Sequence, residues 1–359
     1  MENSLAEIKP ERSLTLDVAK GIGLLLVVLG HLVSSSSIAS TIIFAFHMPL
    51  FFVIHGYLVA ENKSWKKLFK NIFSTLTYYL LFSIIGLIVS VIVKEWRADL
   101  SIRSIVYQTF FVCRPEVLHV GQIWFLISVI WAEFICFVLN KIFTGGGNKI
   151  SICIILAILM ALMFVINRFD LSLPYKETSL PIPFQILSGI AGAFFIEIGV
   201  IIRRYKMLEK IESFHFALRI ILFLILMSLC SSIAYLNKRV NITLSEYNNV
   251  LLFVAAGILG SLAVIVLSSL VKGVVGKCVA YFGKNSLYGF AIHSLFIYSY
   301  AAIISLIFQK GYIIMENIPI LLSILGTVFV LVLVALVIPA FRYTVGKLVP
   351  AMSKKIFNI

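Results

Sequence analysis

Long apolar runs, separated by short polar segments, dominate the chain from residue 15 onward. A transmembrane helix needs roughly 20 mostly apolar residues to cross about 30 Å of hydrocarbon. The pattern therefore predicts an all-α, polytopic transmembrane bundle of about ten helices. The predicted helices lie near residues 15–35, 40–60, 72–93, 121–141, 150–167, 184–202, 217–236, 250–271, 287–309 and 319–341.

The first apolar run is predicted to stay in the mature protein. It carries Asp17 and Lys20 within the run and ends in Ser34–Ser37. A cleaved signal peptide would instead end in a small-residue cleavage site.

Lys and Arg residues are unevenly divided between the segments that join these runs. With the N-terminus in the cytoplasm, 21 of the 30 Lys and Arg residues fall on the cytoplasmic side and 9 fall outside. Because cytoplasmic loops of membrane proteins are enriched in Lys and Arg, both termini are predicted to be cytoplasmic. The expected organisation is a cytoplasmic segment 1–13, a membrane domain 14–342 and a cytoplasmic tail 343–359.

Composition supports lipid as the solvent for much of the chain. Hydrophobic residues make up 61% and charged residues 13%, against about 45–50% and about 25% in soluble domains. The formal net charge of +14 comes from clusters between apolar runs, which is the pattern of membrane topology and excludes a nucleic-acid-binding face. The five cysteines lie singly without metal-ligand spacing, so no metal site is predicted.

Two ionisable residues mark one face of the first helix. Lys20 and His31 are 11 residues apart, which brings them within about 20° of the same face and separates them by about 16 Å along the axis. The spacing places a cation near the cytoplasmic surface and an imidazole deep in the membrane. Coenzyme A has a similar layout, with phosphates at one end and a thioester at the end of a long arm.

The second helix carries His47 just before Pro49. Because the turn between the two helices is short, His47 is expected at a depth comparable with that of His31. Imidazole suits general-base catalysis since its pKa lies near neutrality. The alternative for either histidine is a hydrogen bond between helices, worth about 1 kcal/mol.

Other polar residues in predicted helices are weaker candidates. Glu133 and Glu197 are each suited to orient a histidine or to pair with a basic residue, and for Glu197 the pair would be Arg203 or Arg204. Trp124 fits an interfacial anchor or a platform for substrate. His293, in the middle of a predicted helix, is a candidate for the wall of the same cavity.

Two further histidines fall between predicted helices. His119 and His215 are both expected to be solvated in loops.

Together these residues resemble the membrane acyltransferases called acyltransferase family 3, and within it the sugar O-acetylases. The matching pieces extend over nearly the whole chain: Asp17-x-x-Lys20-Gly21 with Gly30-His31, Phe46–Phe52, Gly56-Tyr57, the basic stretch Lys66–Lys70 leading to Tyr78, Trp124–Leu126, Phe194-Phe195 with Gly199 before Arg203-Arg204, and Tyr281–Leu287 with His293. Their order and spacing are more specific than any one piece.

The resemblance implies that the protein takes an acyl group, acetyl by the same analogy, from cytoplasmic acetyl-CoA and delivers it to a hydroxyl of an envelope or exported glycan. It implies that His31 is the catalytic base and that Lys20, with Asp17 nearby, helps to hold the coenzyme or orient the site. Lys66, Lys67 and Lys70 would contact the phosphates of the coenzyme, although the positive-inside pattern alone also explains them.

The sequence departs from the family pattern in two places. His55 stands where a serine is usual, and lysines follow the second helix where arginines are common.

Two other classes of function remain open at this point. A transporter of a small polar solute would use the same buried ionisable residues, but it is expected to show paired repeats, and none is found. A non-enzymatic membrane partner has no need to retain both Lys20 and His31. The carbohydrate acceptor stays unidentified, because no spacing singles out polar residues of the outer loops such as Tyr107 and Arg114.

Overall fold

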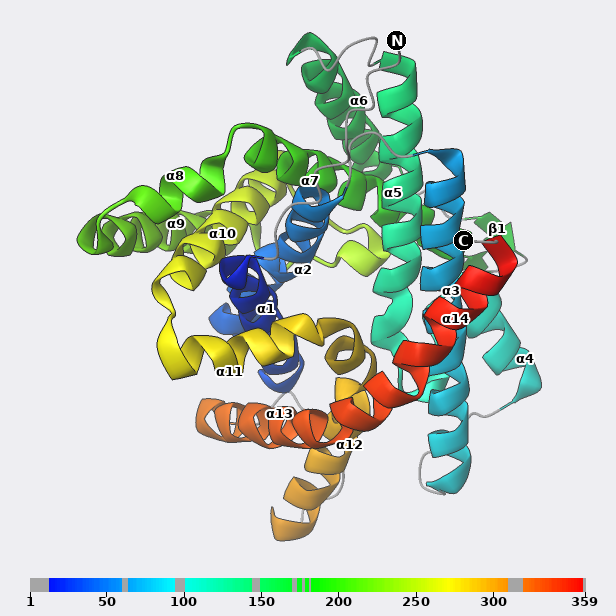
Figure 1. Cartoon of the computed structure of the whole chain (residues 1–359). Helices are drawn as coiled ribbons and strands as arrows, with labels where there is room; N and C mark the ends of the chain where they lie inside the picture. The colour runs from blue at the N-terminus through cyan, green and yellow to red at the C-terminus, as the bar shows by residue number, and fades with distance from the viewer. Residues whose placement is uncertain are drawn as a thin grey trace.

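The computed structural model describes residues 13–59, 64–93, 101–143, 149–169, 173–175, 178–180, 182–308 and 319–357. Within this part of the chain, ten helices are long and apolar enough to cross a membrane. They confirm the predicted polytopic helical bundle (Figure 1). The orientation of the termini stays a prediction.

The first half of the chain forms five helices that lie one after another in the sequence. They are α1 (Leu14–Leu32), α2 (Ile38–Leu58), α3 (Trp65–Ile92), the short α4 (Ile102–Val106) and α5 (Trp124–Phe143). A π-helical turn, Tyr107–Val112, and two 3₁₀ turns, Glu116–Leu118 and Gly121–Ile123, connect α4 to α5.

The second half adds nine helices and a small hairpin. They are α6 (Lys149–Arg168), α7 (Ile186–Arg204), α8 (Met207–Ser213), α9 (Phe216–Asn237), α10 (Val250–Leu270), α11 (Gly273–Lys284), α12 (Ser286–Phe308), α13 (Ile320–Tyr343) and α14 (Val345–Phe357). The antiparallel strands β1 (Leu173–Tyr175) and β2 (Thr178–Leu180) precede α7. This hairpin is the one departure from all-α structure among the described residues.

Helix α1 lies at the centre of the bundle, in contact with α2, α10, α11, α12 and α13 (Figure 1). Close packing of α2 against α7 depends on one glycine from each helix. A Cβ on Gly56 would lie 2.7 Å from the carbonyl carbon of Ile196, and one on Gly199 would lie 2.8 Å from the backbone nitrogen of Tyr57. Small residues of this kind allow helix backbones in membranes to approach closely. These two contacts fix α2 relative to α7.

Helix α11 packs along the first half of α1 through another pair of glycines. A Cβ on Gly21 would lie 2.8 Å from Cγ1 of Val279, and one on Gly283 would lie 2.6 Å from the carbonyl carbon of Asp17. There is therefore no space for a side chain between the two helices at the level of Asp17 and Lys20.

Two helices extend beyond the predicted apolar runs. Helix α3 begins at Trp65, seven residues before the predicted start, and Ser64 caps it by accepting a hydrogen bond from the backbone N–H of Lys67 at 3.2 Å. Because the Ser64 cap starts the helix before the basic stretch, Lys66–Lys70 is helical. The segment after Tyr343 forms α14, which packs against α3 (Figure 1).

Candidate active site

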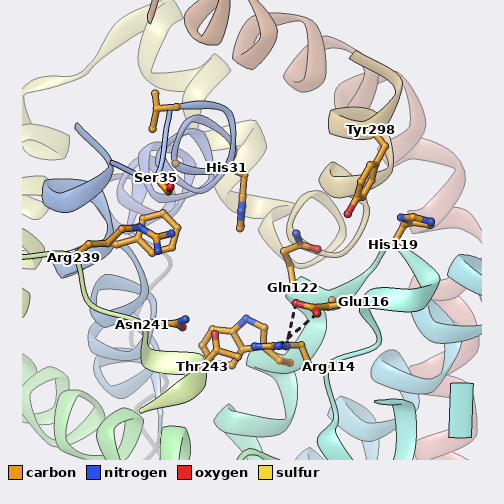
Figure 2. A pocket seen from close by; sticks show the side chains of 15 residues that line it. His31, Ser35, Arg114, Glu116, His119, Gln122, Arg239, Asn241, Thr243 and Tyr298 are labelled. Atoms are coloured by element: carbon orange, nitrogen blue, oxygen red, sulfur yellow. Dashed lines mark hydrogen bonds and ion pairs between the residues drawn. The ribbon is translucent and has the colours of Figure 1, made fainter. Parts of the chain in front are cut away.

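A cavity of about 580 Å³, which we call the His31 cavity, opens at the end of α1 (Figure 2). Residues from α1, α2, α5, α12 and three connecting segments form its wall. They are Gly30, His31, Val33, Ser35, Phe44, Arg114, Glu116, His119, Gly121, Gln122, Trp124, Arg239, Asn241, Thr243 and Tyr298. A smaller space of about 60 Å³, the His47 recess, continues from His31 to His47 and Phe290.

Three imidazole rings, those of His31, His47 and His293, lie near one another in the bundle. The ring centres of His31 and His293 are 5.6 Å apart. Phe44 stands between the first two helices, with its ring centre 6.1 Å from that of His31 and 4.9 Å from that of His47. His31 and His47 thus line one recess, and the ring of His293 lies beside that of His31. That His31 and His47 reach the same depth in the membrane stays a prediction.

The backbone assigns a tautomer to two of these rings. A carbonyl oxygen only accepts hydrogen bonds, so Nδ1 of His293 donates to the carbonyl oxygen of Phe290 at 2.7 Å, and Nδ1 of His47 donates to that of Ile43 at 2.8 Å. In the neutral state each therefore keeps an unprotonated Nε2. The ring of His31 makes no hydrogen bond within the described part of the chain and is only partly buried. His31 is the imidazole that is open to a ligand.

The segment between α9 and α10 brings Arg239 and Asn241 to the cavity. Nε of Arg239 donates a hydrogen bond to Oγ of Ser40 at 3.0 Å, and its guanidinium carbon lies 3.9 Å from the ring centre of Phe44. Asn241 and Glu246 exchange two backbone hydrogen bonds, of 2.9 and 3.0 Å. Burial lowers the pKa of Arg239, an effect that the nearby carboxylate of Glu246 opposes. Arg239 nevertheless stays charged, since a guanidinium is not deprotonated in proteins.

The opposite wall of the cavity comes from the segment before α5. Arg114 forms an ion pair with Glu116, with 3.1 Å between Nε and Oε1 (Figure 2). Trp124 lines both the His31 cavity and the His47 recess, so it stands at the site and not only at a helix end. The expectation that His119 is solvated is wrong, because its half-buried ring lies edge-on to Tyr298, with 4.5 Å between ring centres.

Asp17 and Lys20 form an ion pair near the other end of α1. Nζ of Lys20 lies 3.2 Å from Oδ1 of Asp17. The side chain of Lys20 is 21% exposed and that of Asp17 is 3% exposed. A second cavity of about 600 Å³, the Arg219 cavity, lies beside the start of α1 and is also lined by Thr15, Tyr57 and Lys272. Helix α1 thus has a large cavity near each end.

The remaining predicted site residues lie apart from these cavities. Lys66, Lys67 and Lys70 occupy the first turns of α3, and they line neither the His31 cavity nor the Arg219 cavity. Glu197 is buried in α7, where it accepts a hydrogen bond from the amide of Asn140 at 2.6 Å.

Glu133 does orient a histidine, but that histidine is His55 and not His31, His47 or His293. Its Oε1 lies 2.5 Å from Nε2 of His55, which ties α5 to α2. His55, which departs from the family pattern, thus has a hydrogen-bond partner on a neighbouring helix.

Sequence reasoning missed several polar residues of the cavity wall. Arg239, Asn241, Thr243, Gln122 and Tyr298 come from connecting segments and from α12. The sequence offered one signal, a polar segment 237–249 with four asparagines between two apolar runs. Asparagine side chains commonly bond to nearby backbone and fold a loop back on itself.

Comparisons with known proteins agree with the assignment of a catalytic membrane domain. A family model described as an acyltransferase domain matches residues 14–338. The chain is 31% identical over 163 residues to nodulation protein NolL of Mesorhizobium japonicum (strain LMG 29417 / CECT 9101 / MAFF 303099), and the aligned part is 43% of this chain and 41% of that protein. The chain therefore matches less than half the length of this curated relative. No solved structure matches it.

Proposed function

Because the chain belongs to the acyltransferase family whose domain it matches over nearly its whole length, as its sequence predicted, we propose that it moves an acetyl group from acetyl-CoA to a hydroxyl of an envelope or exported glycan. The observation that carries this proposal is the state of His31. Its ring has no hydrogen-bond partner among the described residues and lies on the wall of a polar cavity of about 580 Å³. A base that must engage a substrate hydroxyl needs this freedom.

In the proposed reaction His31 takes the proton of the acceptor hydroxyl. The oxygen attacks the thioester carbonyl and forms a tetrahedral intermediate, which expels the thiolate of coenzyme A. His31 then gives its proton to the departing sulfur, so that the products are an O-acetyl ester and free coenzyme A. One direct transfer balances all atoms and requires no acyl-enzyme.

The neighbouring histidines support the base. With Nδ1 of His293 donating to Phe290, its Nε2 remains an acceptor beside His31. We propose that His293 positions the ring of His31 by packing beside it and offers it an acceptor once it is protonated, and that His47 closes the inner end of the recess. Charge that develops on His31 during transfer is better tolerated next to lone pairs than next to apolar carbon.

The coenzyme is proposed to approach from the end of α1 that carries Lys20. The Asp17–Lys20 pair fixes a cation about 16 Å along the helix from His31. That span suits a long pantetheine arm whose thioester reaches His31 while its phosphates stay near the surface. Lys66, Lys67 and Lys70 remain the proposed phosphate contacts, and the Arg219 cavity offers further cations, Arg219 and Lys272, at the same end.

The acceptor is proposed to occupy the His31 cavity. Sugars are bound by hydrogen bonds from amides and hydroxyls together with aromatic faces, and Gln122, Asn241, Thr243 and Trp124 supply these groups. The proposed location is the cell membrane, which gives the enzyme access to coenzyme on one side and to glycan on the other.

Purified protein in nanodiscs tests the proposal. Release of free coenzyme A and binding of acetyl-CoA are measured for the native chain, His31→Ala and Lys20→Ala. His215→Ala is the matched control, because His215 is exposed and lines none of the three spaces.

We expect His31→Ala to bind acetyl-CoA with native affinity and to lose at least about 100-fold in turnover. Lys20→Ala should lose affinity, and His215→Ala should match the native chain. Native protein that neither binds nor consumes acetyl-CoA or a longer acyl-CoA would disprove the proposal.

A further inference from the structure

We infer that the acceptor sugar carries an anionic group, a carboxylate or a phosphate, and that Arg239 binds this group while His31 engages the hydroxyl. The inference rests on the proposed acyl transfer at the His31 cavity and adds the class of acceptor. Arg239 and His31 both line that cavity, and they enter it from different elements (Figure 2).

Arg239 has most of its hydrogen-bonding capacity unused. A guanidinium carries five N–H donors, and in Arg239 the Nε–H is bonded to Ser40. The two terminal nitrogens, which carry the other four donors, have no hydrogen-bond partner among the described residues, and no described carboxylate forms an ion pair with them. Such a planar pair of nitrogens matches the two oxygens of a carboxylate or phosphate.

The second arginine of the cavity shows the contrast. Arg114 directs Nε and a terminal nitrogen at the carboxylate of Glu116, at 3.1 and 3.4 Å. That pair leaves its charge neutralised. Among the described lining residues, Arg239 is thus the cation whose charge has no carboxylate partner at ion-pair distance.

The position of Arg239 is held rather than incidental. The face of Phe44 supports the guanidinium at 3.9 Å. Asn248 donates a hydrogen bond to the carbonyl oxygen of Arg239 at 2.9 Å. A side chain fixed from both its tip and its backbone loses little entropy on binding an anion, and this preorganisation favours affinity.

The distance to His31 fits a single sugar. Phe44 lies between the two groups, 3.9 Å from the guanidinium carbon and 6.1 Å from the centre of the His31 ring, so the two are at most about 10 Å apart. A hydroxyl within about 3 Å of His31 and an anionic substituent of the same monosaccharide at Arg239 can both be accommodated. An anion much farther along a chain would lie beyond this arginine.

Three simple acceptors separate the possible ligands. Methyl glucoside is neutral, methyl glucuronide carries a carboxylate, and methyl glucoside 6-phosphate carries a phosphate at the same carbon. Transfer of acetyl from acetyl-CoA to each is measured as kcat/KM for the native chain, Arg239→Gln and Arg239→Lys. Lys238→Gln is the matched control. It removes the same charge at the neighbouring position, and the side chain of Lys238 does not line the cavity.

The native chain is expected to favour at least one anionic acceptor over methyl glucoside by about tenfold or more. Arg239→Gln should reduce this ratio to near one, Arg239→Lys should keep part of it, and Lys238→Gln should keep it whole. Whichever anionic sugar is favoured identifies carboxylate or phosphate. In the native chain the preference for the anionic acceptor should fall as the salt concentration is raised. This measurement does not depend on the folding of any variant.

Equal use of the neutral and anionic sugars by the native chain would overturn the inference and leave the acyltransferase proposal standing. An equal loss on all three acceptors in Arg239→Gln would also overturn it, and would assign Arg239 to the transition state of transfer instead. Absence of coenzyme A release with every acceptor and with water would defeat the proposed function itself.

Discussion

Replacing Gly283 with alanine tests how tightly the fold controls the Lys20 end of the site. A β-carbon at position 283 would stand 2.6 Å from the carbonyl carbon of Asp17 and 3.0 Å from the backbone nitrogen of Gly21. Carbon atoms in contact are about 3.5–4.0 Å apart. Helices α1 and α11 would therefore have to separate by at least about 1 Å, because these atoms, and the carbonyl oxygen of Asp17 that lies closer still, are backbone and cannot rotate away.

Two effects of this separation are expected. Overpacking of this kind costs about 1–3 kcal/mol, so the thermal unfolding midpoint should fall by several degrees. Displacing a group that positions substrate by about 1 Å costs about 100-fold in rate. Gly283→Ala should therefore fold and bind acetyl-CoA more weakly. Its kcat/KM for the release of coenzyme A should fall about 100-fold.

The control is Gly23→Ala, on α1 itself. A β-carbon there meets the ring of Phe51 at 2.9 Å and a methyl carbon of Leu50 at 3.2 Å. These are side-chain ends that can shift, so the losses of stability and activity should be clearly smaller. Native stability and activity in Gly283→Ala, or equal damage in Gly23→Ala, would show that the backbone contact of α11 with α1 does not control the Lys20 end of the site.

Three other predictions follow from contacts elsewhere in the bundle. The losses of unfolding free energy in Asp17→Asn and Lys20→Met should be non-additive by about 1 kcal/mol, because either change alone removes the ion pair and keeps the other charge in a membrane helix. Additive losses would contradict an interaction between the two charges. Changing His293 to Ala should lower kcat about 10- to 100-fold with little change in KM for acetyl-CoA and should alter the pH–rate profile, because the ring beside His31 positions the base; an unaltered pH–rate profile would leave it a packing role. A variant that keeps Cys278, exposed on α11, as its single cysteine should react with a membrane-impermeant maleimide only from the cytoplasmic side; labelling from outside would reverse the predicted topology.

The helices could be predicted from the sequence because each one is a long apolar run, and that signal is local. All ten predicted segments correspond to helices of the structure. That His31 and His47 share one polar pocket was also predictable, since a short turn joins their helices. Helix α11 was not predicted, because its 12 residues are too few to cross a membrane and its position depends on the fit of Gly21 and Gly283 against another backbone.

The wall of the cavity was predictable only where it belongs to a membrane helix. His31 and Trp124 were identified in this way, whereas His293, predicted for the wall, lies buried behind it beside the ring of His31. Arg239 was counted only as one more positive charge outside the membrane, because its place depends on Ser40 and Phe44, some 200 residues earlier in the chain. His119 was assigned to solvent for the same reason, since its contact with Tyr298 joins distant segments.

Transfer of the acetyl group from the Lys20 end of α1 to the His31 end is tested in sealed proteoliposomes. Labelled acetyl-CoA is supplied only on the side of Lys20, and methyl glucoside and methyl glucuronide only on the side of His31. We expect labelled O-acetyl sugar on the acceptor side for the native chain and none for His31→Ala. Labelled product that forms only when donor and acceptor share one side, or undiminished transfer in His31→Ala, would contradict this transfer.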